Sequence, residues 1–152
     1  MTIDFHFFRT PLSEHWTRIG FLAIAVLFNL CLVAQLLTVG LAVFYSPTWW
    51  NMHVWLVRGY GGLAVLLSVG LLISPFPRKI QMLTGGLVTL LILQFITIHL
   101  NHPLPLGVLH PLIGFTLFNS STTLVHQVWR VVFNESDAVT CAEPYPSISI
   151  KK

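Results

Sequence analysis

The hydrophobic positions divide the chain into four long apolar segments separated by short polar breaks. A helix that spans a bilayer needs roughly 20 mostly apolar residues. Four stretches meet that length: 19–45, 50–74, 80–100 and 107–133. Connections of only a few residues force consecutive helices to be antiparallel. The pattern therefore predicts an all-α integral membrane protein, an up-down-up-down four-transmembrane-helix bundle over residues 19–133.

The two flanks of this domain have a different character. Thr10 and Pro11 are typical of an N-cap followed by a proline at the first helical position. Several aromatic side chains predict that residues 1–18 form a segment at the membrane interface: Phe5, Phe7, Phe8 and Trp16. Residues 134–152 mix charge with prolines and serines, which predicts a flexible tail on the cytoplasmic side.

Charge supports the membrane assignment and gives it a direction. Only 9% of the residues are charged and 55% are hydrophobic, whereas soluble domains carry about 25% charged residues. Basic residues lie in both flanks and beside Pro77, at Arg78 and Lys79, while the loops 46–49 and 101–106 carry no charge. The positive-inside rule then predicts both termini inside. A bacterial plasma membrane and a thylakoid membrane are both compatible with the sequence as its location.

Several function classes lack their signatures. Cys31 lies in an apolar segment and Cys141 in the tail, so they predict no disulfide scaffold. No phosphate-binding loop, nucleophile elbow, zinc-protease motif or dinucleotide fingerprint occurs. The net charge of +3 without a basic stripe gives no reason to expect nucleic acid, and the bilayer is the expected partner. Four spans without broken helices argue against a transporter.

Two histidines near the starts of the second and fourth segments provide the main candidate chemistry. His53 and His110 are predicted at matching depth near the outer face, on helices that are diagonal partners in the bundle. Ionisable residues inside a membrane mark function by default. Haem iron takes axial histidines, and bundles hold cofactors between facing helices. We therefore expect a haem b with His53 and His110 as its ligands.

Helical periodicity identifies the faces that these histidines share. Positions i, i+4, i+7 and i+11 lie on one face of a helix. From His53 these positions are Val57, Tyr60 and Ala64, and from His110 they are Gly114, Leu117 and Ser121. The small residues among them leave room for a flat ring, but small residues also let bare helices approach closely in membranes.

A weak internal repeat adds two glutamines to the candidate site. His53 follows Gln35 by eighteen residues, and His110 follows Gln94 by sixteen. A buried glutamine can orient a ligand's second nitrogen or bond a cofactor edge. The alternative is an interhelical hydrogen bond that serves packing alone.

Arg58 is the only lysine or arginine in the predicted spans that lies away from the inner end, where Arg130 is found. We expect it to pair with a cofactor carboxylate or a lipid phosphate, because an unpaired arginine in a membrane is costly. The alternative is that its side chain extends to the outer surface.

The remaining histidines allow weaker alternatives. His99 and His102, together with His53 and His110, define a candidate site for a non-haem transition metal. His15 and His126 share the inner depth, so a second haem there is conceivable. His6 is expected to be solvated.

A polar run, Asn119 to Thr123, lies near the middle of the fourth segment. We expect some of its side chains to bond back to carbonyls of their own helix and others to bond across to neighbouring helices. The run is interpreted as polar contacts that hold the bundle together.

The pattern Gln35…Gly40-Leu-Ala-Val-Phe44…His53, then Gln94…Leu109-His110-Pro111-Leu-Ile-Gly114, resembles a family of small bacterial four-helix membrane proteins that is catalogued only as a domain of unknown function. The resemblance covers roughly residues 20–130 and implies the two-histidine, two-glutamine arrangement. More distantly, the histidine pair is similar to one half of haem A synthase and to cytochrome b561-like bundles. That likeness implies haem ligation by His53 and His110. The chain lacks the acidic residues and the extracellular cysteine pair of the synthase, which argues against synthase activity.

Two functions are therefore expected from the sequence. The first is a membrane b-type haem protein that passes electrons within or to a membrane complex, with a quinone or a larger complex as its partner. The second is a cofactor-free structural or assembly subunit of a larger membrane complex. Whether the protein is an enzyme stays open.

Overall fold

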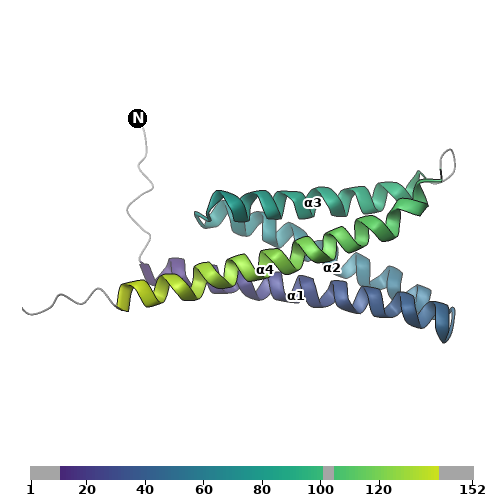
Figure 1. Cartoon of the computed structure of the whole chain (residues 1–152), viewed down its shortest axis with the longest axis horizontal. Helices are drawn as coiled ribbons and strands as arrows, with labels where there is room; N and C mark the ends of the chain where they lie inside the picture. The colour runs from purple at the N-terminus through teal and green to yellow at the C-terminus, as the bar shows by residue number, and fades with distance from the viewer. Residues whose placement is uncertain (1–10, 101–104, 141–152) are drawn as a thin grey trace, which may run out of the picture.

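Four long α-helices make up the described part of the chain in the computed structural model, which covers residues 11–100 and 105–140, with side chains for 15–100 and 105–133. No strand occurs among these residues. In chain order the elements are α1 (Pro11–Phe44), α2 (Trp49–Ile73), α3 (Arg78–His99), the short 3-10 helix η2 (Leu106–Leu109) and α4 (His110–Thr140). The four long helices lie side by side (Figure 1).

The ends of the helices differ from the predicted spans in two places. Helix α1 is continuous from Pro11, so the part of the expected interfacial segment that is described joins the first span without a break. No glycine or proline separates Pro11 from Ile19, so nothing local ends the helix there. Helix α4 continues past Phe133 to Thr140 for the same reason. The rest of the expected tail, 141–152, lies outside the described residues.

Three of the helices are long and apolar enough to cross a membrane: His15–Phe44, Trp49–Ile73 and Arg78–His99. Helix α4 is not among them. Its polar run from Asn119 to Thr123 lowers its hydropathy, although its length is sufficient. The described residues are therefore compatible with a membrane protein in which α4 is the most polar helix.

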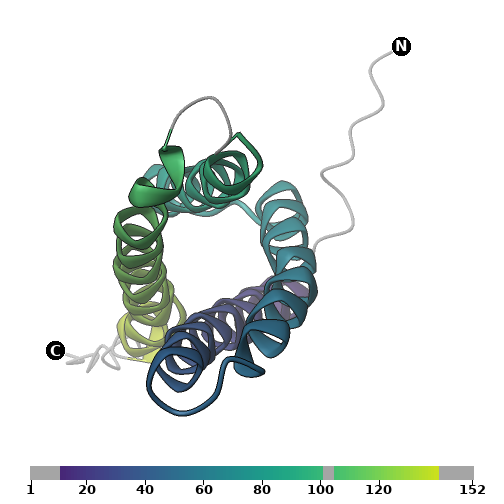
Figure 2. The same ribbon diagram turned by 90° about the vertical axis from the view of Figure 1, so that its right-hand side faces the viewer.

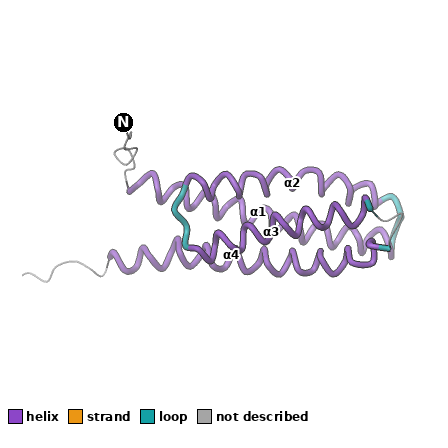
Figure 3. The backbone as a smooth tube through the Cα atoms, turned by 90° about the horizontal axis from the view of Figure 1, so that it is seen from above, coloured by secondary structure: helices purple, strands orange, loops and turns teal. Residues whose placement is uncertain are grey.

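The helices surround a common axis, with each one packed against its neighbours in chain order and α4 packed against α1. Helices α2 and α4 lie diagonally opposite each other, as do α1 and α3 (Figure 2). The chain reverses direction at each connection (Figure 3). We call the end at the α1–α2 connection and η2 the histidine end, because His53 and His110 lie there. The opposite end, with Arg18, Arg78, Lys79 and Arg130, is the basic end.

Buried side chains follow the spacing of three and four residues that is typical of packed helices. On α3 the buried positions include Ile80, Thr84, Leu87, Leu91 and Gln94. On α2 and α4 they include Tyr60, Ala64, Leu117 and Ser121, which the sequence placed on the faces of His53 and His110. The helix faces that continue from His53 and His110 are therefore buried at these positions.

The polar run of α4 forms both kinds of bond that the sequence predicted. Thr122 and Thr123 donate to the carbonyl oxygens of Phe118 and Asn119, one turn earlier, at 3.0 Å and 2.9 Å. Asn29 of α1 donates from Nδ2 to Oγ1 of Thr122 at 2.9 Å. This last bond ties α1 to α4 across the bundle surface.

Replacing Thr122 with valine should weaken the bundle, because the substitution keeps the side-chain shape but removes the acceptor for Asn29. Interhelical hydrogen bonds in membrane proteins contribute about 0.6 kcal/mol on average and up to about 1.7 kcal/mol. Thr123→Val is the matched control, because the described bond of Thr123 stays within α4. Denaturant unfolding in detergent should show the loss for Thr122→Val only, and equal losses in the two variants would contradict the interhelical role.

Candidate functional site

Each helical hairpin places a glutamine, a threonine and a histidine together at the histidine end. We call Gln35, Thr38 and His53 half-site A, and Gln94, Thr97 and His110 half-site B. The glutamines and threonines are buried, with both glutamines only 9% exposed, and the histidines are half-buried. The glutamine and threonine lie at the end of α1 or α3, and the histidine lies at the start of the next long helix.

In half-site A the side chain of Gln35 covers one ring nitrogen of His53. Nε2 of Gln35 lies 3.0 Å from Nε2 of His53 and donates to the backbone carbonyl oxygen of His53 at 3.1 Å. Thr38 Oγ1 lies 3.4 Å from the other ring nitrogen, Nδ1, and donates to the carbonyl oxygen of Gln35 at 2.8 Å. Trp50 packs its ring edge-on against the imidazole, with centroids 5.6 Å apart. Both nitrogens of His53 therefore have partners on α1.

Half-site B repeats part of this arrangement. Thr97 donates from Oγ1 to the backbone carbonyl oxygen of Gln94 at 2.9 Å, as Thr38 does to that of Gln35. The amide of Gln94 lies against Gly114, where an added Cβ would come within 3.4 Å of its Nε2. The amide of Gln94 therefore lies beside Gly114, one turn beyond His110.

Three buried polar atoms of the two half-sites have no hydrogen-bond partner. They are Oε1 of Gln35, Oε1 of Gln94 and Nδ1 of His110. Buried polar groups are normally satisfied by protein, water or ligand, because leaving one unpaired costs about 1–3 kcal/mol. Their concentration at the histidine end marks this region as a candidate binding site.

The two half-sites face a shared interior. Helices α2 and α4 are diagonal, and each begins at the histidine end, so His53 and His110 lie at the same end of the bundle. Below them the core continues with apolar side chains, among them Tyr60 and Leu117, which are 3% and 1% exposed. The core side of both half-sites is therefore closed by buried apolar side chains.

Sequence reasoning missed Thr38 and Thr97. Both follow their glutamine by three residues, as Gln35-Leu-Leu-Thr38 and Gln94-Phe-Ile-Thr97. The repeated Gln-x-x-Thr spacing was the available signal, because residues three apart lie on one face of a helix. It places each hydroxyl beside the backbone carbonyl of its own glutamine.

The structure does not bring the other candidate residues into this site. Arg58 is exposed, and its guanidinium lies over the ring of Trp55, 5.4 Å from the centroid. His99 is exposed and its Nδ1 donates to the carbonyl oxygen of Phe95 at 2.8 Å. His15 and His126 are exposed as well.

His6 and His102 lie outside the described residues. Within the described part of the chain, no group of three or more histidine, cysteine, aspartate or glutamate residues is placed to hold a metal ion. A metal centre at the histidine end would therefore have only the imidazoles of His53 and His110 as its protein ligands among the described residues.

Comparison with known proteins gives one family match. Residues 35–99 match the family described as "Family of unknown function (DUF6220)". The resemblance to a family of unknown function is thereby confirmed. The matched range contains all of half-site A, together with Gln94 and Thr97 of half-site B, and ends before His110. No match was found among curated proteins or among solved structures.

Proposed function

We propose that this chain is a multi-pass membrane protein that binds haem b between His53 and His110 and passes electrons within or to a membrane complex. One observation carries the proposal: two hairpins with similar half-sites each place a half-buried histidine at the same end of the bundle, on diagonal helices. Intramembrane histidines are costly without a partner, and ligation of a metal is a common reason for keeping them.

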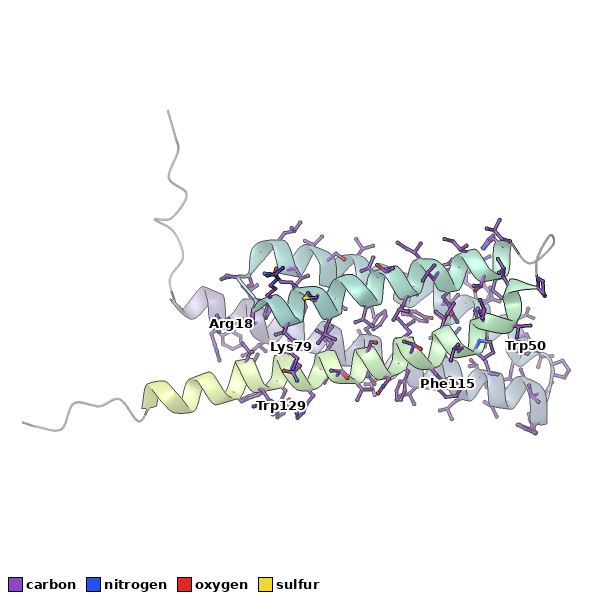
Figure 4. The ribbon with its side chains drawn as sticks, turned by 45° about the horizontal axis from the view of Figure 1, so that its top comes forward. Arg18, Trp50, Lys79, Phe115 and Trp129 are labelled. Carbon is purple, nitrogen blue, oxygen red and sulfur yellow. The ribbon has the colours of Figure 1, made fainter. Side chains whose placement is uncertain are left out.

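The proposal includes four spans and both termini on the inner side. Helix α4 is the fourth span, because its length matches its neighbours and it packs between α3 and α1. Arg18 and Lys79 lie together at the basic end, whereas Trp50 lies at the opposite end (Figure 4). Basic residues favour the inner side of a membrane and aromatic residues favour its interfaces. A bacterial plasma membrane or a thylakoid membrane fits this orientation.

The donor set fits haem better than a bare metal ion. A structural or catalytic zinc site needs three or four protein ligands, and the described residues offer no such group. A porphyrin fills four positions of its iron itself, so two axial imidazoles are sufficient. Bound haem would supply a one-electron iron couple. The chain's own contribution is to hold the two imidazoles and to exclude water.

Half-site A places one condition on this proposal. Nε2 of His53 is covered by the amide of Gln35, so ligation through that nitrogen requires the Gln35 side chain to turn aside. The side-chain oxygen Oε1 of Gln35 has no hydrogen-bond partner, so only the side-chain nitrogen Nε2 gives up bonds when the side chain moves. The expected role of the glutamines at the cofactor edge stays part of the proposal.

Visible spectroscopy of the purified protein tests the proposal directly. After reconstitution with haem b in detergent, dithionite reduction should give a sharp α-band of bis-histidine type, at about one haem per chain, because two imidazoles are the axial donors. A saturating titration that leaves only the spectrum of free haem would contradict the proposal.

The second candidate is a cofactor-free subunit of a larger membrane complex. The observation that favours it is the complete bonding of the His53 ring to Gln35 and Thr38 without any ligand. In that case the half-sites are packing contacts between helices. Co-purification of a stoichiometric partner with a chain that does not bind haem would support this candidate. A quinone or a redox complex as partner belongs to the first candidate.

A further inference from the structure

We infer that Thr38 is a positioning residue that fixes the tautomer of His53, with the proton on Nδ1 and the lone pair on Nε2. The inference rests on the proposed function for its purpose, because Nε2 is then the nitrogen that can bind iron. It concerns a residue that acts on His53 and does not itself touch the cofactor.

The proton of the Thr38 hydroxyl gives the first constraint. A hydroxyl has one proton and a carbonyl oxygen can only accept. The short bond of 2.8 Å from Oγ1 to the Gln35 carbonyl oxygen therefore uses that proton. At the 3.4 Å contact with Nδ1 of His53, the Thr38 oxygen can then act only as an acceptor. Nδ1 must carry the proton for this contact to be a hydrogen bond.

The amide of Gln35 gives a second constraint that does not depend on the first. An amide nitrogen donates two protons and accepts none. Nε2 of Gln35 faces the carbonyl oxygen of His53 at 3.1 Å, so a flipped amide would set two acceptor oxygens against each other. With the nitrogen in this position, its second proton is available for Nε2 of His53, 3.0 Å away. That ring nitrogen must accept, so it has no proton.

Both constraints select the same neutral imidazole. Which nitrogen of a ligating histidine binds the metal is set by the bond that the other nitrogen makes. In half-site A the Thr38 hydroxyl makes that bond to Nδ1 of His53. Gln35 covers Nε2, the nitrogen that would bind iron, and would have to give way to it. In half-site B, Thr97 makes the same bond to its glutamine carbonyl, but Nδ1 of His110 has no partner. The two histidines are therefore held differently, and Thr38 is specific to His53.

Nitrogen NMR of the haem-free protein tests the tautomer without any cofactor. The full chain is labelled with 15N-histidine in detergent at about pH 8.5, where an ordinary histidine with a pKa of about 6.5 is neutral. The His53 signals are assigned by their absence in His53→Ala. In the wild-type protein Nδ1 of His53 should be the protonated nitrogen. Protonation at Nε2 would overturn the inference.

Three variants separate positioning from packing. Thr38→Val should shift the tautomer ratio of His53 by about three- to tenfold towards Nε2–H, the range expected from one net hydrogen bond. Thr38→Ser should restore the wild-type ratio, because it keeps the hydroxyl. Thr97→Val should leave the His53 ratio unchanged. An unchanged ratio in Thr38→Val, or an equal shift in Thr97→Val, would overturn the inference.

The outcome is independent of haem binding, so the two proposals fail separately. A protein that binds haem but shows Nε2–H at His53 in its haem-free state would retain the proposed function and lose this inference. A protein that binds no haem but responds to Thr38→Val as described would retain the role of Thr38 and lose the function.

Discussion

Replacing His53 with alanine should abolish the bis-histidine haem spectrum of the reconstituted protein, and His110→Ala should do the same. Each variant removes one of the two axial donors, and the described residues provide no third candidate ligand beside them. Loss of residues that merely orient a metal ligand costs about 10–100-fold in metal affinity. Loss of the ligand itself should cost at least about 100-fold, measured by haem titration of the detergent-solubilised protein.

The matched control for this experiment is His99→Ala. His99 lies at the same end of the bundle but is exposed and bonded to its own helix, so its removal should leave the α-band and the haem affinity unchanged. Added imidazole should restore a low-spin spectrum to His53→Ala, since it can enter the space left by the side chain. Circular dichroism checks that the variants stay helical. If neither core histidine affects the spectrum, the haem assignment is wrong.

Much of the fold followed from segment length and helical periodicity. Four helices were expected because four stretches are long enough to span a bilayer, and the described residues contain four long helices. The buried faces of α2 and α4 were predictable because every third or fourth residue from His53 and His110 turns to the same side. Tyr60 and Ser121 are buried for that reason, at 3% and 1% exposure.

Other features depend on contacts that no local pattern encodes. The guanidinium of Arg58 lies over Trp55, three residues earlier, and periodicity alone does not decide between this contact and the partners that the sequence suggested. The atom of His53 that Gln35 covers depends on side-chain rotamers and on the distance between α1 and α2. The role of Thr38 was hidden because a lone threonine in a membrane helix usually bonds to its own backbone, which Thr38 also does.

The polar run of α4, Asn119 to Thr123, affects both the hydropathy of the helix and its packing against its neighbours. It lowers the hydropathy of α4 below that of the other three helices, yet Ser121 is buried and Thr122 binds α1 through Asn29. A polar side chain that bonds to a neighbouring helix has its hydrogen-bonding capacity met by the protein. A helix with such a run can therefore span a bilayer when it is packed against partners, although its sequence alone is less apolar.

Replacing Gly70 with alanine should destabilise the bundle at its basic end. A Cβ at Gly70 would lie 2.7 Å from Cδ2 of Phe21, closer than real side-chain carbons approach. Phe21 cannot easily move, because it is buried and its ring packs against Phe76 with centroids 4.5 Å apart. Overpacking of this kind costs about 1–3 kcal/mol. Unfolding of the detergent-solubilised protein by denaturant should show this loss.

The sign of the effect separates packing from helix propensity. Glycine to alanine in a helix interior normally stabilises by roughly 0.5–1 kcal/mol. Gly62 lies on the same helix with nothing within 4 Å of an added Cβ, so Gly62→Ala makes the identical chemical change in open space. Gly62→Ala should be neutral or stabilising, whereas Gly70→Ala should be destabilising. The same sign in both variants would show that close contact between α1 and α2 at Phe21 does not limit the residue at position 70.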